Sequence, residues 1–193
     1  MQSTSEKMIG ELASQIQSLL DTQGRALVAI DGRCASGKTT LSEALQPLFD
    51  CNVIHMDDFF LQPHQRTQER YQEPGGNVDY ERVEAEIIKP ILAGNGFVYQ
   101  RFDCQTMSLK EGQKRGWKNV TIMEGAYSCH PRLREVYDLR VFLTVEPEEQ
   151  VRRIIARSGE EKAKMFLQKW IPLEEQYIEA CRVRECCELQ FET

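Results

Sequence analysis

The sequence has little basic charge and lacks the features that direct a chain to polymers or membranes. Its 24 Lys and Arg residues are outnumbered by 30 Asp and Glu residues, giving a net charge of -6. Because nucleic acids and anionic lipids attract basic surfaces, neither is expected as a partner. The chain also lacks an apolar run long enough to span a bilayer, and its start, "MQSTSEKMIGELASQ", lacks an export signal's charged flank and apolar stretch. We therefore expect a cytoplasmic protein.

The cysteines lack the pattern of a disulfide framework or a zinc site. There are seven of them, an odd number, and none forms a C-x-x-C pair. This usage favours free thiols. Cys34 is set apart because it lies near a predicted helix N-terminus, where the pKa of a thiol tends to fall.

What the sequence does contain is an alternation of apolar runs and helical patterns. With 193 residues, 41% of them hydrophobic and 28% charged, the chain is typical of one globular domain spanning residues 1–193. Strands that alternate with helices predict an α/β fold with a mostly parallel sheet and helices on both faces, a three-layer α/β/α arrangement. The elements predicted are an N-terminal helix within 1–20, strands at 26–31, 51–56, 97–102, 120–125 and 139–145, helices at 38–48 and 80–92, a surface loop at 61–79, and helices from residue 147 onward with a break near 157–161. Residues 184–192 fit either a short strand or a tail.

The strongest functional signal is a glycine-rich loop. Gly32 to Thr39 fits G-x-x-x-x-G-K-[ST] and lies between a predicted strand and a predicted helix, as a phosphate-binding P-loop requires. Backbone N–H groups of such a loop converge on phosphates, Lys38 adds positive charge for the β- and γ-phosphates, and the Thr39 hydroxyl can hold Mg²⁺. The loop predicts ATP and Mg²⁺ as cofactors, bound by Gly32, Ala35, Ser36, Gly37, Lys38, Thr39 and Thr40.

Carboxylates follow two other predicted strands. Asp57 and Asp58 come at the carboxyl end of the strand after the P-loop helix, the edge where open α/β sheets bind ligands. Either could accept a hydroxyl proton during phosphoryl transfer, or cap a helix N-terminus. Glu124 ends the apolar strand "VTIME", a position suited to holding Mg²⁺ or its waters.

These motifs together resemble the uridine kinase-like family of P-loop kinases. The resemblance is carried by "GRCASGKTT", "HMDDFF", "NVDYERV", "RFDCQT" and "MEGAYSCH", in that order, from about residue 25 to about residue 157. It implies that Asp57 is the catalytic base, that Thr39 and Glu124 are Mg²⁺ partners, and that Asp79 holds hydroxyls of a sugar. It also implies substrate contacts at Phe102 and Asp103, where nucleoside-specific members have a tyrosine ahead of Asp-Phe.

The stretch "EQVRRIIARSG" resembles the lid of such kinases, here placed at about residues 147–162. Guanidinium groups stabilise the negative charge that spreads over the transferring phosphoryl oxygens. Arg153 and Arg157 are the catalytic candidates and Arg152 is a candidate for the substrate, although the register among the three stays open. A solvated helix face with Glu–Arg pairs is the alternative.

The expected reaction is transfer of the γ-phosphoryl group of Mg-ATP to a hydroxyl of a small molecule, with a pyrimidine nucleoside as the acceptor that the resemblance implies. Sugar phosphates, pantothenate and other nucleosides stay open, because the histidine that reads the pyrimidine base has no counterpart near Met107. A non-catalytic nucleotide-binding switch is a further alternative, but the guanine-reading [NT]KxD motif of GTPases is absent. A homo-oligomer is compatible with the sequence, and Trp170 could cover the site from the last long helix.

Overall fold

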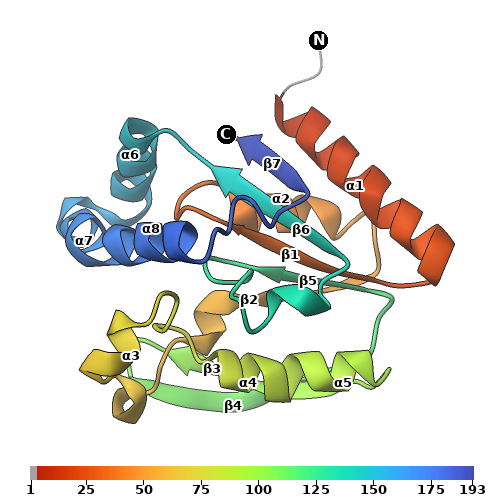
Figure 1. Ribbon diagram of the computed structural model, residues 1–193, viewed down its shortest axis with the longest axis horizontal. Coiled ribbons are helices and arrows are strands. Elements are labelled where there is room, and N and C mark those ends of the chain that lie inside the picture. Colours follow the sequence, from red (N-terminus) through yellow and green to blue (C-terminus); the bar gives the residue numbers. More distant parts are fainter. Residues whose placement is uncertain (1–3) are drawn as a thin grey trace.

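The computed structural model describes residues 4–193 and has a five-stranded parallel sheet at its centre (Figure 1). The strand order is β2-β5-β1-β6-β7, and every neighbouring pair is parallel. Parallel strands place their carboxyl ends at one edge, which is where the predicted functional residues follow. The strands are β1 (Ala26–Gly32), β2 (Cys51–His55), β5 (Val120–Glu124), β6 (Leu139–Thr144) and β7 (Leu189–Glu192).

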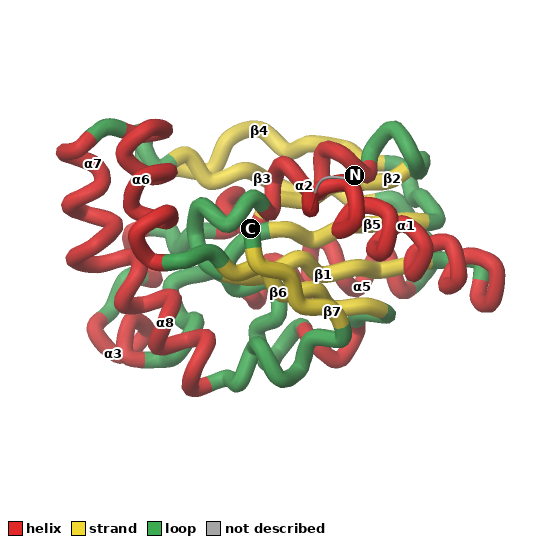
Figure 2. Tube along the Cα trace, turned by 90° about the horizontal axis from the view of Figure 1, so that it is seen from above, coloured by secondary structure: helices red, strands yellow, loops and turns green. Residues whose placement is uncertain are grey.

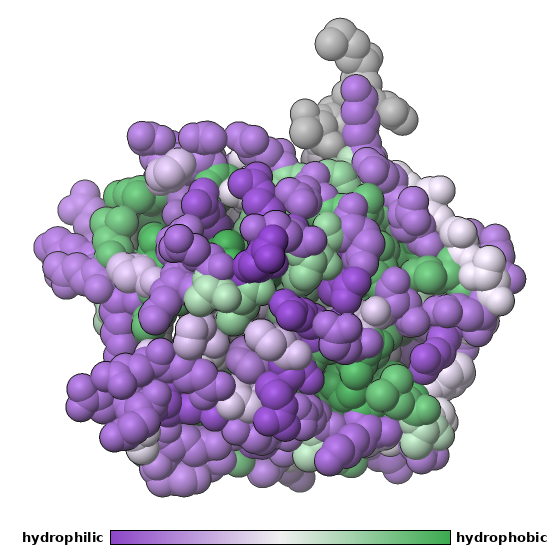
Figure 3. Space-filling model, viewed as in Figure 1, coloured by the Kyte–Doolittle hydropathy of each residue, from purple (hydrophilic) through white to green (hydrophobic). Residues whose placement is uncertain are grey.

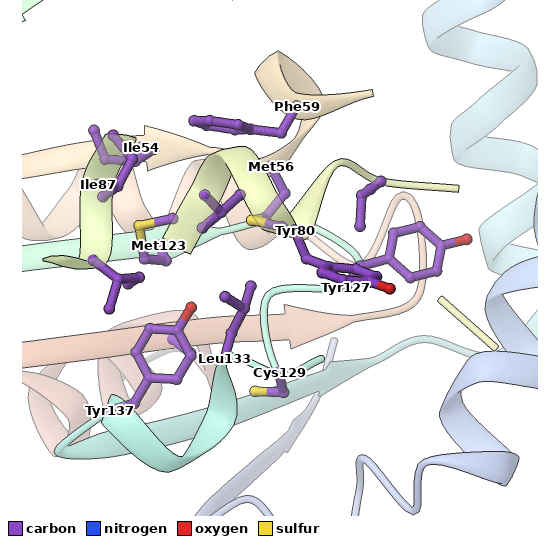
Figure 4. Packing of buried hydrophobic residues seen from close by; sticks show 14 of the residues in the cluster. Ile54, Met56, Phe59, Tyr80, Ile87, Met123, Tyr127, Cys129, Leu133 and Tyr137 are labelled. Carbon is purple, nitrogen blue, oxygen red and sulfur yellow. The ribbon is translucent and has the colours of Figure 1, made fainter. Parts of the chain in front are cut away.

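The central strands β1, β5 and β6 are mostly apolar and almost entirely buried, because both faces of the sheet are covered. In β1, Leu27 and Ala29 belong to the cluster on one face, and Val28 and Ile30 to the cluster on the other. Successive side chains of a strand point to opposite faces, so a strand buried on both sides has no polar alternation. Figure 4 shows side chains of the larger cluster, among them Ile54, Met56 and Met123.

Helices form the two outer layers. On one face, Leu12 and Ile16 of α1 pack with Leu41 and Leu45 of α2. On the other, the helical segment 80–92 supplies buried apolar residues and includes a π-helical stretch, Val83–Ile88. Helices α6, α7 and α8 lie at the left of Figures 1 and 2, on the side of the carboxyl ends of the strands. The helices are α1 (Thr4–Gln23), α2 (Lys38–Leu45), α3 (Gln68–Gln72), α4 (Tyr80–Arg82), α5 (Lys89–Leu92), α6 (Pro147–Ser158), α7 (Glu160–Met165) and α8 (Ile171–Ala180).

The predicted strand at 97–102 exists but lies outside the parallel sheet. It is β3 (Phe97–Asp103), which forms an antiparallel hairpin with β4 (Ser108–Arg115), a strand that the sequence analysis missed. Most β4 side chains are exposed, so its sequence carries no apolar run. The mostly parallel sheet is therefore correct, with this hairpin as a separate addition.

Some observed helix and strand boundaries differ from the predicted ones by a few residues. The P-loop helix ends at Leu45 rather than at residue 48, and β2 ends at His55. The segment 61–79 is a surface loop only in part, because it contains α3 and its residues 75–79 are buried. The open choice for 184–192 is resolved, because β7 pairs with β6 at the sheet edge. Of the helix predicted within 1–20, residues 1–3 lie outside the described residues.

The face drawn in Figure 3 is mostly polar, with apolar side chains in separate patches. In the part of the chain that is described, no helix combines the length and apolar character needed to cross a bilayer. All seven cysteines are free thiols, as predicted.

Candidate active site

The sheet topology brings three segments far apart in the sequence to one edge. β5 lies between β2 and β1, and its last residue, Glu124, is in register with His55 of β2 and Ile30 of β1. The P-loop, the Asp57 turn and Glu124 therefore meet, although Asp57 follows Thr39 by 18 residues and Glu124 follows Asp57 by 67. All three segments lie at the carboxyl ends of the parallel strands.

The P-loop depends on backbone conformations that glycine adopts readily. Gly32 has φ +134°, and a Cβ there would lie 1.9 Å from the Leu143 carbonyl oxygen of the neighbouring strand. Gly37 has φ +89° directly before α2. Lys38 folds back across the loop, and its Nζ donates to the Gly32 and Arg33 carbonyl oxygens, each at 2.7 Å. The ammonium group thus lies within the loop that the motif assigns to phosphates.

Helix α8 holds the P-loop from the side. Glu174 Oε2 accepts a hydrogen bond from the Cys34 N–H at 2.8 Å. Two hydrogen bonds join Arg33 to Glu175, Nε to Oε1 at 2.7 Å and Nη2 to Oε2 at 3.0 Å. The sequence does not indicate these contacts, because more than 100 residues separate the partners and neither segment carries a pattern that points to the other.

The prediction that the Cys34 pKa falls is wrong. Burial and the nearby charge of Glu174 raise the pKa of the Cys34 thiol to about 12. Burial likewise raises the pKa of Glu174 to about 7, although Lys38 and the Cys34 N–H favour its charged form. The helix N-terminus does not offset the loss of water around the thiol.

Asp31, at the end of β1, is a second buried acid behind the loop. Its carboxylate accepts from the Gly32 N–H at 2.6 Å, the Cys129 N–H at 2.7 Å and the Tyr177 hydroxyl at 2.7 Å. Burial raises its pKa despite these donors. Neither Asp31 nor Tyr177 was predicted from the sequence, because one acidic residue at a strand end is not distinctive.

The two predicted metal partners lie together. Thr39 Oγ1 donates to Glu124 Oε1 at 3.1 Å, and His55 Nδ1 lies 2.5 Å from the same oxygen. The hydrogen bond to Glu124 raises the pKa of His55. A hydroxyl and a carboxylate beside a phosphate loop fit Mg²⁺, which binds few protein oxygens and keeps water and phosphate ligands. Residues 4–193 contain no cluster of three or more His, Cys, Asp or Glu side chains that could hold a metal without such ligands.

The structure separates the two neighbouring aspartates. Asp57 lines the cavity. The loss of solvation by surrounding protein atoms and the charge of Glu124 raise the pKa of its carboxyl. Asp57 is nevertheless exposed to solvent. Asp58 is buried instead, and its Oδ1 accepts from Arg101 Nε at 2.8 Å. Of the two aspartates, only Asp57 lines the cavity.

A cavity of about 1540 Å³ contains these groups. Its wall includes most of the predicted nucleotide-binding and catalytic residues, together with aromatic side chains such as Phe60, Tyr71 and Trp170. The predicted residues in the wall are Ala35, Ser36, Gly37, Lys38, Thr39, Thr40, Asp57, Glu124, Arg153 and Arg157.

Helix α6 fixes the register that the sequence left open among the arginines. Arg153 and Arg157, four residues apart and so on one helix face, both line the cavity. Arg153 Nη1 donates to the Ala35 carbonyl oxygen at 3.2 Å, and Nε pairs with Glu149 at 2.7 Å. Gly159, with φ +81°, separates α6 from α7. The predicted substrate role of Arg152 lacks support from its position, because it is exposed and pairs with Glu149 outside the cavity.

Asp79 lies outside the cavity wall, contrary to the implied contact with sugar hydroxyls. It is 1% exposed. Its Oδ1 accepts from the Arg82 N–H at 3.1 Å, capping α4, and its Oδ2 accepts from Gln65 Nε2 at 2.8 Å. The carboxylate thus holds the segment after Asp57 against α4.

The two hairpin residues predicted to contact substrate are also not among the cavity-lining residues, although the neighbouring Cys104 is. Phe102 is buried beneath the guanidinium group of Arg66, which is 5.5 Å from the ring centroid. Asp103 Oδ1 accepts from the Gln105 N–H at 2.7 Å, within the turn that joins β3 to β4. The substrate contacts predicted for Phe102 and Asp103 are not made by the cavity wall as it stands.

Comparison with known proteins places this fold among P-loop kinases. No protein-family model matches the sequence. The bifunctional alpha-galactosidase/sucrose kinase of Mediterraneibacter gnavus is 28% identical over 205 residues, covering 93% of this chain. The chain spans only 22% of that relative's length.

Two solved structures illustrate the likeness. One, described as a possible uridine kinase from Bacillus stearothermophilus, is 22% identical with a TM-score of 0.61, over 94% of this chain and 99% of the other. The second is phosphoribulokinase from Rhodobacter spheroides, 10% identical with a TM-score of 0.60, over 87% of this chain and 70% of the other. The three-layer P-loop kinase fold predicted from the sequence is confirmed.

Proposed function

We propose that this protein transfers the γ-phosphoryl group of Mg-ATP to a hydroxyl of a small molecule. The observation that carries the proposal is the convergence of Lys38, Asp57 and the Thr39–Glu124 pair in one cavity. Phosphoryl transfer needs positioning and charge stabilisation more than covalent chemistry, and these side chains offer both.

Each of these residues has a separate role in the proposed reaction. Asp57 takes the proton of the acceptor hydroxyl while the acceptor oxygen bonds to the γ-phosphorus and the bond to the β–γ bridging oxygen breaks, so that ADP leaves. Lys38, Arg153 and Arg157 supply positive charge around the transferring group. Thr39 and Glu124 would hold Mg²⁺, which neutralises phosphate charge when it is bound. The raised pKa of Asp57 suits a base, because it brings the carboxyl closer to working pH.

A sugar is the acceptor class that we favour. The bifunctional relative, whose name includes a sucrose kinase, aligns with 93% of this chain, which supports a carbohydrate hydroxyl. A pyrimidine nucleoside is the second candidate, supported by the motifs shared with the uridine kinase-like family. The placement of Phe102 and Asp103 outside the cavity weighs against the nucleoside.

The test is ADP release from Mg-ATP with a panel of sucrose, monosaccharides, uridine and cytidine. In Asp57→Asn we expect turnover to fall by roughly 10²–10⁴-fold with ATP binding retained, because the loss is that of a general base. Asp50→Asn is the matched control, since Asp50 is exposed and precedes β2 at its other end. Equal turnover in the Asp57 variant would refute the base assignment. ATP binding without acceptor-dependent ADP release would favour the non-catalytic switch.

A further inference from the structure

The wall of the cavity includes an aromatic group that the reaction scheme does not use. Phe60, Tyr71 and Trp170 line the cavity from segments far apart in sequence. The Trp170 and Phe60 ring centroids are 6.5 Å apart, and Lys169 Nζ lies 4.7 Å from the Trp170 ring and 5.0 Å from the Tyr71 ring. These contacts connect the helices beyond the sheet with the segment that follows Asp57.

Trp170 ends a π-helical turn, Phe166–Trp170, directly before α8. π-Helical turns occur frequently at functional sites. The indole is half-buried, and within residues 4–193 its N–H has no hydrogen-bond acceptor. A half-buried indole N–H in the cavity wall can donate a hydrogen bond to a ligand, because the ring is apolar and its N–H is polar.

Arg66 contributes a second free donor group to the same wall. Its Nε donates to the Leu61 carbonyl oxygen at 2.9 Å, and its guanidinium group lies over Phe102. These contacts fix the orientation of the Arg66 guanidinium group. No carboxylate among the described residues pairs with it, and its two terminal nitrogens are left for a ligand.

We propose that Trp170 and Arg66 bind the acceptor, and that the acceptor is a carbohydrate. This inference rests on the proposed kinase function and adds the residues that select its substrate. The sugar ring lies with its C–H face against the indole, and its non-reacting hydroxyl oxygens accept from Arg66 and the indole N–H. The reacting hydroxyl faces Asp57.

The donor chemistry favours a sugar over a pyrimidine. Both free groups are donors only, and sugar hydroxyl oxygens can accept from each of them. A uracil edge instead presents an N–H donor between two carbonyl oxygens, so that the two donors leave its N–H unpaired. Unpaired polar groups in a binding site are what sites discriminate against most strongly.

The first experiment uses the two tryptophans of the chain, Trp117 and Trp170. Trp117→Phe removes the exposed tryptophan after the hairpin and leaves Trp170 as the only indole reporter. Titration of this variant with sucrose, in the presence of a non-hydrolysable ATP analogue and Mg²⁺, should change its emission saturably. A response to uridine but not to sucrose would overturn the carbohydrate assignment, and no response to an acceptor that is turned over would overturn the role of Trp170.

The second experiment separates acceptor binding from nucleotide binding. Trp170→Leu and Arg66→Lys should each raise the KM for the sugar by roughly tenfold, the loss of one good contact, with the KM for ATP unchanged. Trp170→Phe should recover part of the loss. Trp117→Leu and Arg115→Lys, on the exposed hairpin end, are matched controls expected to match the parent.

These experiments distinguish a failure of the acceptor assignment from a failure of the proposed kinase function. If both variants keep the parent's KM for the acceptor, or raise only the KM for ATP, the acceptor assignment is refuted while the kinase function stands. If the parent shows no acceptor-dependent ADP release with any member of the panel, the proposed function itself is refuted.

Discussion

Replacing Glu174 with glutamine tests whether α8 holds the P-loop through a buried acid. Glu174 is 7% exposed, and burial raises its pKa from 4.5 to about 7. The folded state keeps this proton up to about pH 7, whereas the unfolded chain releases it near pH 4.5. Glu174 therefore contributes most stability below pH 4.5, and that contribution is lost as the pH rises to 7. The difference between the two pKa values corresponds to about 3 kcal/mol.

Glutamine keeps an oxygen that can accept from the Cys34 N–H but carries no charge at any pH. Glu174→Gln should therefore match the parent near pH 4.5 and exceed its free energy of unfolding by up to about 3 kcal/mol above pH 7. Urea denaturation at pH 5, 6, 7 and 8 measures the difference, and other titrating groups cancel between the two proteins. Glu175→Gln is the matched control, because it instead loses an ion pair with Arg33 and should not gain on the parent as the pH rises. A pH-independent difference for Glu174→Gln would refute the reasoning.

The remaining predictions concern stability. Gly32→Ala should cost more than about 3 kcal/mol or prevent folding, because its Cβ would overlap the Leu143 carbonyl oxygen at a φ of +134°. Gly10→Ala, in the exposed middle of α1 with no atom within 4 Å of the new Cβ, should instead gain about 0.5–1 kcal/mol, and thermal unfolding compares the two. Tyr177→Phe removes a donor from buried Asp31 and should lower the free energy of unfolding by about 1–3 kcal/mol in urea, and an unchanged value would contradict that hydrogen bond.

Most of the fold was predictable because its signals are local. The continuous apolar runs of β1, β5 and β6 reflect burial on both faces, and the glycine spacing at residues 32–39 reflects a backbone path that few other residues adopt. The β3–β4 hairpin escaped prediction because the exposed β4 leaves little apolar pattern.

The residues of the candidate site were likewise predictable only where their signals are local. Lys38, Thr39, Asp57 and Glu124 were recognisable because each follows directly on a predicted strand or turn, and parallel strands end at one edge. Asp79 was assigned to the substrate by its motif. Only the packing of the loop against α4 makes it a helix cap that also holds Gln65.

The sequence by itself determined the order of strands and helices, the phosphate loop and the presence of acids at the strand ends, because these depend on periodicity and on single backbone conformations. Tertiary structure decided which of two adjacent aspartates meets the cavity, which arginines of α6 face it, and why the Cys34 thiol holds its proton. Those outcomes depend on burial and on partners such as Glu174, 140 residues away in the chain. Burial and distant charge leave no trace in a local sequence pattern, because they exist only once the chain has folded.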